Sequence, residues 1–415
     1  MDASYLRKIV QCFVISAVVL TTVGLLHADE DMGLSEALSD FYKNNYDILI
    51  SKYEIDKSYG DYIGSRLLPN PDLSFNYSFI SLQDFPKATD NTQTVTRIDQ
   101  LIELGGKRGL RTDAASATLD AAKLTQKDTV RTLLIGFYTL FYNSNADILN
   151  AKLAHDELER FDKTLAIADK KHAAGFLSLV DYTKLKLVRI DLQNALSTAE
   201  AQLKNDIEQF GMLLGSATPR QPALLVREDF KNYTEEELIW SAEQYRYDLL
   251  SIEKQLQASE LSQRLAKAQV IPDITAGVEF DTIGVRNTPG LGFGFSVPLP
   301  IFNRNQGEIA RRKAEYSQLE TQREKIKRQI VSDIRLSLNN YVMSTKIFDT
   351  YKSKKREMED LMSRSEQAFS LGGITVLDLL DTEKTYREFM SKYNQALVQG
   401  NLNGALLKVY TGGIE

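Results

Sequence analysis

Proline is confined to part of this chain, and its absence elsewhere limits what the chain can form. The nine prolines leave residues 87–218 and 301–415 entirely free of that residue. A proline inside a helix costs ~3 kcal/mol, so its absence permits very long helices. Alanine, leucine, lysine, glutamate and glutamine dominate both stretches, with apolar residues at helical spacing. The sequence therefore predicts long helices over residues 105–170 and 302–370.

The segments beside the prolines alternate between apolar and polar residues. Leu73, Phe75 and Tyr77, for example, are separated by Ser74 and Asn76. A period of two is typical of a strand with one apolar face. Four strands are predicted, at 71–83, 92–104, 272–283 and 289–300. Residues 81–91 and 284–288 would join them in pairs.

The two halves of the chain repeat the same motifs in the same order. Gly175-Phe-Leu-Ser178-Leu-Val-Asp181 recurs as Gly372-Gly-Ile-Thr375-Val-Leu-Asp378, and a proline-flanked strand start recurs in the same way. We expect a first repeat over 29–215, a linker over 216–233 and a second repeat over 234–415. Each repeat has a leading helix (34–67 or 234–268), two strands, a long helix and a return helix (176–212 or 375–410).

The first 28 residues have the pattern of an export signal. Arg7 and Lys8 precede an apolar run that ends near Leu26, and acidic residues begin at Asp29. This predicts a cleaved signal peptide over residues 1–28, with a retained anchor helix as the alternative. The single cysteine, Cys12, leaves with the signal.

Composition excludes several classes of function. The net charge is −6 with no basic block, which argues against a nucleic-acid partner. One cysteine and three histidines cannot build a Cys/His metal site or a Cys-His nucleophile pair. We therefore expect no enzyme activity, no cofactor and no bound metal.

The predicted lengths point to an elongated oligomer. At 1.5 Å per residue, each long helix would measure ~105 Å, and two shorter helices end to end would match it. Four amphipathic strands cannot close a barrel alone, and in a membrane every strand edge must be paired. The chain is therefore expected to oligomerise in order to close a barrel in outer-membrane lipid.

Two stretches resemble the TolC family of trimeric outer-membrane efflux channels, in particular its heavy-metal (CzcC/CusC-like) branch. They are Gln100-Leu-Ile-Glu103-Leu-Gly105-Gly106-Lys107-Arg108-Gly-Leu-Arg111 and the segment from Ser296 to Ile309, with Pro298-Leu-Pro300-Ile-Phe302-Asn303-Arg304. The resemblance implies a mainly α homotrimer with a 12-stranded β-barrel continuous with an α-helical tunnel. It also implies a periplasmic adaptor (membrane fusion) protein and an inner-membrane pump, of the RND type, as partners.

Glycine-rich segments lie where each second strand meets a long helix. Gly105-Gly106-Lys107-Arg108 lacks the first glycine and the Ser/Thr of a phosphate loop, so we interpret it as a strand-to-helix corner. The segment containing Asn303, Arg304 and Gly307 is expected to form the second corner.

The resemblance places the narrow periplasmic end of the channel at the predicted turns of Gly175 and of Gly372-Gly373, where family members line the closed pore with aspartates. Asp181 and Asp378 stand three residues after Ser178 and Thr375, as in a capping box, so they are pore candidates that serve first as caps. Asp381 is the better candidate, because capping does not need it. Ile374 stands where family members carry an arginine that helps to lock the closed end.

Other residues have simpler interpretations than a ligand site. His155 and His172 are expected on a solvated helix face. Met358 and Met362 fit an apolar helix stripe better than copper binding. Trp240, with Tyr245 and Tyr247, is expected to pack near the repeat boundary.

The sequence as a whole predicts a passive outer-membrane efflux channel with a long periplasmic portion, conducting heavy-metal cations. Two alternatives remain open: the same fold serving drug efflux or protein export, and a structural periplasmic coiled-coil protein. The four paired strands argue against the second alternative, because a filament has no use for them.

Overall fold

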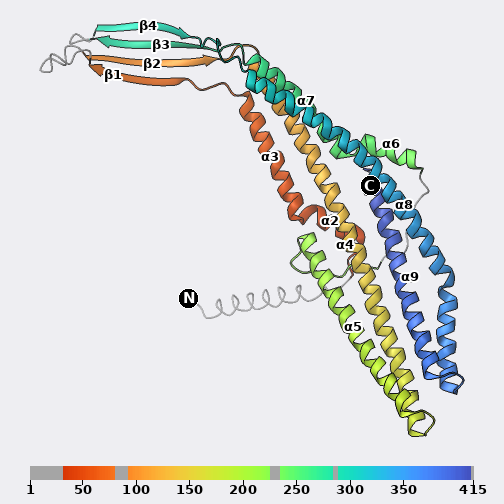
Figure 1. The fold of residues 1–415 in the computed structure, drawn as a ribbon. Helices are drawn as coiled ribbons and strands as arrows, with labels where there is room; N and C mark the ends of the chain where they lie inside the picture. Colours follow the sequence, from red (N-terminus) through yellow and green to blue (C-terminus); the bar gives the residue numbers. More distant parts are fainter. Residues whose placement is uncertain (1–30, 80–91, 225–233, 284–287, 413–415) are drawn as a thin grey trace, which may run out of the picture. The chain divides into compact units, whose positions relative to one another are not determined.

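The computed structural model describes residues 31–79, 92–224, 234–283 and 288–412. Long helices and one four-stranded sheet make up most of this part of the chain (Figure 1). The predicted signal peptide, the segment 81–91 and most of the segment 284–288 lie outside the described residues.

The two long helices are α4, Lys107–Ala173, with 67 residues, and α8, Gln306–Leu371, with 66 residues. Return helices follow each of them: α5, Leu179–Leu214, and α9, Val376–Tyr410. The prediction of long helices from the missing prolines is thus confirmed.

The helices that precede the strands are each divided in two, whereas the sequence predicted single helices over 34–67 and 234–268. The structure has α2, Leu34–Asn44, then α3, Tyr46–Arg66, and in the second half α6, Glu235–Tyr245, then α7, Tyr247–Ala268.

The breaks fall at Asn45 and Arg246, and each is held by side-chain contacts. The side chain of Asn45 accepts the backbone N–H of Ile48 at 3.0 Å and donates to the carbonyl of Leu213 at 2.8 Å. Arg246 is 2% exposed, and its guanidinium donates to Asp248 and Asp333. These bonds stabilise a non-helical backbone at both positions.

The strands are β1, Asp72–Phe79, β2, Thr92–Ile102, β3, Ile274–Ile283, and β4, Thr288–Ser296. They pair in chain order and antiparallel (Figure 1). The last strand is shorter than predicted, since it ends before Pro298 and Pro300. These prolines have no N–H to donate to a neighbouring strand.

The described chain forms two compact units. Among the described residues, the hairpin unit draws on those within Met1–Leu49, Arg131–Glu237 and Ile334–Glu415, and the sheet unit on those within Ile50–Val130 and Leu238–Asp333. Each unit therefore takes residues from both halves of the chain. The order of elements is also the same in both halves: two helices, two strands, a long helix and a return helix.

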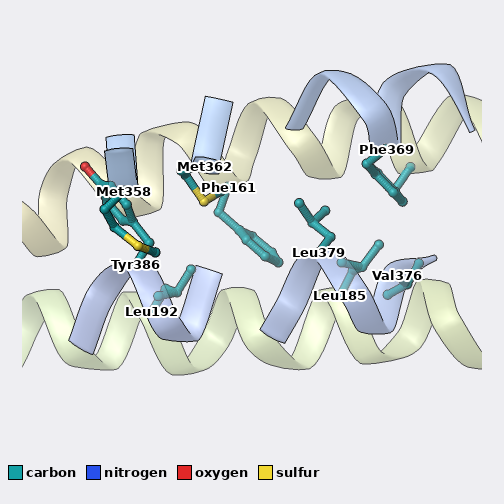
Figure 2. Close-up of a cluster of buried hydrophobic side chains, with 10 residues drawn as sticks. Phe161, Leu185, Leu192, Met358, Met362, Phe369, Val376, Leu379 and Tyr386 are labelled. Atoms are coloured by element: carbon teal, nitrogen blue, oxygen red, sulfur yellow. The ribbon is translucent and has the colours of Figure 1, made fainter. Parts of the chain in front are cut away.

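The core of the hairpin unit lies between α4, α5, α8 and α9 (Figure 2). Its buried members are Phe161, Ala168, Leu185, Leu192, Met358, Met362, Phe369, Val376, Leu379 and Tyr386. Burying a large apolar side chain contributes ~1.5–3 kcal/mol, so this core stabilises the packing of the α4–α5 hairpin against the α8–α9 hairpin. It also confirms that Met358 and Met362 belong to an apolar stripe.

The aromatic residues of α6 do not pack as expected. Trp240 is 62% exposed and Tyr245 is 56% exposed in the single chain, so the packing prediction was wrong for these two residues, whereas Tyr247, the first residue of α7, is half-buried. On a helix as short as α6, the spacing of these two residues could not show which helix face packs against the rest of the protein.

Candidate functional site

The sheet has one apolar face and one polar face, as the alternation predicted. In the register of the four strands, Leu73, Ile98, Val278 and Phe293 are directly opposite one another. All four are exposed, as are their neighbours on this face: Phe75, Tyr77, Ile102, Phe280, Leu291 and Phe295. An apolar surface of this extent is typical of contact with lipid or protein.

The opposite face carries a network of charged groups. The guanidinium of Arg97 lies 2.8 Å from Asp99 and 3.5 Å from Glu279, and Gln93 donates to Asp281 at 2.8 Å. With Asp72, which lies opposite Asp99, this face of the described sheet carries four carboxylates and one arginine, so it has an acidic excess. The strands place these residues on one face because they fall at alternate positions.

Glycines on the polar face leave room for these side chains. A Cβ on Gly277 would lie 2.0 Å from Oδ1 of Asp99, and one on Gly292 would lie 2.8 Å from Cγ of Glu279. The charged side chains therefore lie across the glycine backbone of the neighbouring strand. Because glycine has no side chain, the charged groups can lie flat on the polar face of the sheet.

The first strand-to-helix corner is fastened by ion pairs within the sheet unit. Gly105 and Gly106 both have φ of 69°, and α4 begins at the next residue, Lys107. The ammonium of Lys107 is buried and lies 2.7 Å from Asp273, which also accepts the backbone N–H of Leu104 at 2.9 Å. Arg108 is exposed. The corner interpretation thus fits the backbone.

Arg111 adds a second connection at this corner. Its guanidinium donates to both oxygens of Glu103, at 2.5 and 3.1 Å, and to the carbonyl of Ser65 at 3.1 Å. The end of β2, the end of α3 and the first turn of α4 are therefore held together by one side chain.

The second corner uses asparagine instead of glycine. Asn305 has φ of 61°, and α8 begins at Gln306. Its side chain donates to the carbonyl of Ala266 at 2.8 Å, and Asn303 accepts its backbone N–H at 2.9 Å. Arg304 and Gly307 are exposed. Asparagine tolerates the left-handed region better than most residues, so the corner forms without a second glycine pair.

The tips of the two helical hairpins have the same backbone. We call residues 172–184 the first tip and the matching residues 369–381 the second tip. Gly175 and Gly372 both have φ of 80°. The N–H of the residue after each glycine bonds back into the long helix, from Phe176 to Lys171 at 2.8 Å and from Gly373 to Ala368 at 2.8 Å. This is a Schellman ending, which requires a residue that accepts positive φ.

Both return helices begin with a side-chain cap. The hydroxyl of Ser178 accepts the N–H of Asp181 at 3.0 Å, and the hydroxyl of Thr375 accepts the N–H of Asp378 at 3.2 Å. Asp378 also accepts the N–H of Thr375 at 3.0 Å, which completes a capping box. The hydroxyl of Ser178 also donates to the carboxylate of Asp181 at 2.8 Å and, with the ammonium of Lys184, lowers the pKa of Asp181. The hydroxyl and the backbone N–H of Thr375 both donate to the carboxylate of Asp378 and lower its pKa, so both carboxylates are charged at neutral pH.

The tips differ one turn beyond the cap. The ammonium of Lys184 lies 3.2 Å from Asp181 and balances its charge. Asp381 stands at the matching position of α9, where it is exposed, as is Asp378. Within the described ranges, no lysine or arginine forms an ion pair with either of these aspartates. The second tip thus carries two carboxylates on adjacent turns of one helix. Ile374 packs against the core of the hairpin unit.

The two histidines have separate surroundings. His155 is exposed and lies 3.5 Å from Asp156. His172 bonds through Nδ1 to the carbonyl of Leu177 at 2.9 Å and stacks on Tyr182 at 4.6 Å, so it is part of the first tip. Across the residues that the structure describes, no group of three His, Cys, Asp or Glu side chains is arranged to hold a metal ion.

One group of titratable residues in the structure was not predicted from the sequence. Glu157, Glu366 and Glu383 come from α4, α8 and α9 and face one another inside the hairpin unit. Nothing in the local sequence around each glutamate distinguishes it from a surface residue. Only the packing of three helices brings them together.

No helix of the described part of the chain is both long and apolar enough to cross a bilayer.

Comparisons with known proteins agree with one another. The sequence profile of a family described as "Outer membrane efflux protein" matches residues 38–216 and 238–412. The chain is 26% identical over 382 residues to the cobalt-zinc-cadmium resistance protein CzcC of Cupriavidus metallidurans, covering 88% of this chain and 86% of that protein. It is 23% identical over 387 residues to the outer membrane protein TolC of Escherichia coli, covering 82% and 75%.

Solved structures of similar fold cover nearly the whole chain. A crystal structure of CusC matches with a TM-score of 0.78 and 15% identity, covering 94% of this chain and 96% of that chain. The outer membrane protein VceC of Vibrio cholerae matches with a TM-score of 0.77 and 16% identity, covering 92% and 97%.

Proposed function

Because this chain belongs to the outer membrane efflux protein family, we propose that it is the outer-membrane channel of a system that exports heavy-metal cations. The family is not enzymatic, and its channels lie in the outer membrane with a periplasmic helical extension. They are trimers that work in tripartite systems. A periplasmic adaptor and an inner-membrane pump of the RND type are the partners that we propose for this chain.

The sheet supports the channel assembly. Its apolar face is exposed along all four strands, and within the described sheet β1 and β4 each pair on one side only. Three copies joined edge to edge would give a 12-stranded barrel that places the apolar faces against lipid. The polar face, with Arg97, Asp99, Glu279 and Asp281, would then line the lumen. Its acidic excess would favour cations over anions.

The second tip supports a charged periplasmic mouth. In a trimer, Asp381 and Asp378 would contribute six carboxylates to one narrow ring. Like charges at close range attract cations and raise one another's pKa. Asp381 would carry the pore role, since Asp378 is also occupied by its cap with Thr375. Asp181 is balanced by Lys184 and would contribute little.

The substrate assignment rests on one observation, the similarity to the cobalt-zinc-cadmium resistance protein over 88% of this chain. The acidic polar face and the second tip are compatible with that cargo. A second candidate is an organic substrate, because the chain is also 24% identical over 328 residues to a pyoverdine export outer membrane protein of Pseudomonas putida.

Deleting the gene in its own host separates the two candidates. We expect the deletion strain to retain cobalt, zinc or cadmium during efflux from preloaded cells and to regain efflux with the wild-type gene. The same deletion strain is also tested for retention of an organic dye or a siderophore, which measures export of the second candidate substrate. Normal metal efflux together with loss of organic export would contradict the metal assignment and support the second candidate.

A further inference from the structure

Three glutamates from three helices meet beside the core of the hairpin unit. Glu157 lies on α4, Glu366 on α8 and Glu383 on α9, and we call them the glutamate cluster. Next to them is a small pocket of about 10 Å³, enough for one water-sized molecule. It is lined by Glu157, Arg160, Leu192, Met362, Glu383, Tyr386 and Arg387. Leu192, Met362 and Tyr386 belong to the core (Figure 2), so the pocket places four charged side chains directly beside apolar ones.

Polar atoms in this cluster lack hydrogen-bond partners. Glu157 is only 8% exposed, and its Oε1 atom has no partner in the described structure. The same is true of Nε of Arg160 and Oε1 of Glu366, which lie 3.8 Å apart, too far for a hydrogen bond. A buried carboxylate oxygen without a donor is costly, and a proton removes that cost.

The charges around the cluster do not balance when every group is ionised. Arg160 of α4 and Arg387 of α9 are the two guanidinium groups beside the three carboxyls. Arg160 also stacks on the ring of Tyr386 at 4.6 Å. One carboxyl is therefore left without a cation of its own.

The remaining charged groups nearby are engaged elsewhere. Lys163 of α4, at the edge of the cluster, is bound by Glu159 at 2.9 Å. On α5 the pocket residue is Leu192, and Arg189 of that helix is bound to Asp162 at 2.6 Å. The side chains of the described residues here do not form a site for a metal ion. A proton is the ligand that would complete the cluster.

The surroundings favour the protonated form. Burial raises the pKa of Glu157 to about 7. Burial, together with the charges of Glu366 and Glu157, raises the pKa of Glu383 to about 7. Burial also raises the pKa of Glu366, against the opposing effect of Arg160. All three shifts have the same direction and the same leading cause.

We propose that the glutamate cluster is a proton-binding latch, which holds the α4–α5 and α8–α9 hairpins packed together when protonated and loosens them when it ionises. The chemistry requires only that packing buries the carboxyls and that loosening exposes them. The latch is independent of which substrate the channel carries.

The sign follows from proton linkage. The packed hairpins bind protons up to about pH 7, whereas solvated carboxyls release them near their ordinary pKa of about 4.3. At a pH below this ordinary pKa, protonation stabilises the packed hairpins to its full extent relative to the loosened ones. That advantage is lost as the pH rises through about 7, so acid favours packed hairpins and neutral or alkaline conditions favour loosened ones.

Amide hydrogen exchange on the full-length trimer in detergent tests the latch. After correction for the intrinsic pH dependence of exchange, we expect the opening constant of α9 near Glu383 to rise about tenfold or more between about pH 5.5 and pH 8. The Glu157→Gln and Glu383→Gln variants mimic the protonated state and should flatten this rise. Glu388→Gln, at an exposed site of the same helix, is the control and should keep the wild-type profile.

A second measurement on the wild-type protein does not depend on whether the variants fold. The infrared band of protonated carboxyl groups should persist to about pH 7 and should be absent at pH 8. An opening constant that is flat in the wild type, or carboxyls fully ionised by about pH 5.5, would overturn the proposal. Protection restored at pH 8 by added Mg²⁺ or Zn²⁺ would also overturn it, because the cluster would then be a cation site.

Discussion

The two hairpin tips share a backbone but differ in charge. Each has a glycine with φ of 80° at the end of the long helix, followed by a hydroxyl cap at the start of the return helix. One turn further, the first tip has Lys184 and the second has Asp381. The lysine balances Asp181 at 3.2 Å, while the second tip keeps two uncompensated carboxylates.

This difference separates structural from functional demands. A cap needs a hydroxyl and, for the full box, an acid three residues later, and both tips have these residues. The next position, Lys184 in the first tip and Asp381 in the second, is exposed and is not part of the cap, so it can vary without cost to the fold. A charge that folding does not require, placed where the proposed channel narrows, is better explained by what passes through the channel.

The largest effect is expected from making the second tip resemble the first. In Asp381→Lys the new ammonium should pair with Asp378, as Lys184 pairs with Asp181. The proposed ring would change by six charges in the trimer, and we expect the cation-to-anion permeability ratio to fall by about tenfold. Reversal potentials in a planar bilayer measure it.

Glu200→Lys is the control for this substitution. It makes the same charge change at an exposed site of α5, about six turns beyond the cap residue Ser178. An equal loss of selectivity in both variants would show that overall charge, not the second tip, sets the preference.

Substitution of the glycine in either tip should lower stability by a similar amount, because the two glycines have the same backbone conformation. Alanine at Gly175 or Gly372 would meet no atom within 4 Å, so the cost is the left-handed backbone alone, ~1–2 kcal/mol for each. We expect thermal unfolding of the detergent-solubilised trimer, followed by circular dichroism, to show similar losses. Gly136→Ala, inside α4 with equal space, should instead stabilise by ~0.5–1 kcal/mol.

Removing the two caps should lower stability by modestly different amounts. Thr375→Ala removes a reciprocal box and should cost ~1 kcal/mol, whereas Ser178→Ala removes a cap in which only the hydroxyl bonds with Asp181, and should cost less. The pKa of Asp378 is lowered, so its stabilising contribution is present above its ordinary value of about 3.9 and is lost as the pH falls through the lower folded value. Unfolding of both variants and the wild type at neutral and acid pH checks the order. A Ser178→Ala loss greater than that of Thr375→Ala would refute it.

The smallest effect is expected from Lys184→Ala. The ion pair with Asp181 is exposed, and such pairs contribute ~0–1 kcal/mol. Stability should therefore change little, while Asp181 loses its balancing charge and the channel becomes slightly more selective for cations. A decrease in cation selectivity would contradict the assignment of Lys184 as the residue that neutralises the first tip.

Much of the fold could be predicted from local patterns. The missing prolines predicted α4 and α8, and the alternation predicted the strands to within a few residues. Asparagine is a common helix cap, so Asn45 carried a local signal for its break that the prediction of a single helix over 34–67 did not use. The break at Arg246 depends on Asp333, far along the chain, and no local pattern reveals it.

The candidate sites divide in the same way. Glycine corners and capping motifs are local in sequence, so the sequence alone is enough to recognise them. Glu157, Glu366 and Glu383 belong to helices that are distant in sequence, and only packing makes them a cluster. The balance of Asp181 by Lys184 falls between these cases, because the spacing of three residues was visible but the contact itself was not predicted.

The most direct test of the channel proposal is the current through single wild-type and Asp381→Asn trimers in a planar bilayer. Asparagine removes three charges and leaves the capping box of Thr375 and Asp378 in place, so folding should survive. We expect the wild type to prefer cations and to be blocked by a trivalent cation from the periplasmic side, and both properties to weaken in Asp381→Asn. Unchanged selectivity and block would contradict a pore role for Asp381, and a wild-type protein that forms no ion-conducting pore would contradict the channel itself.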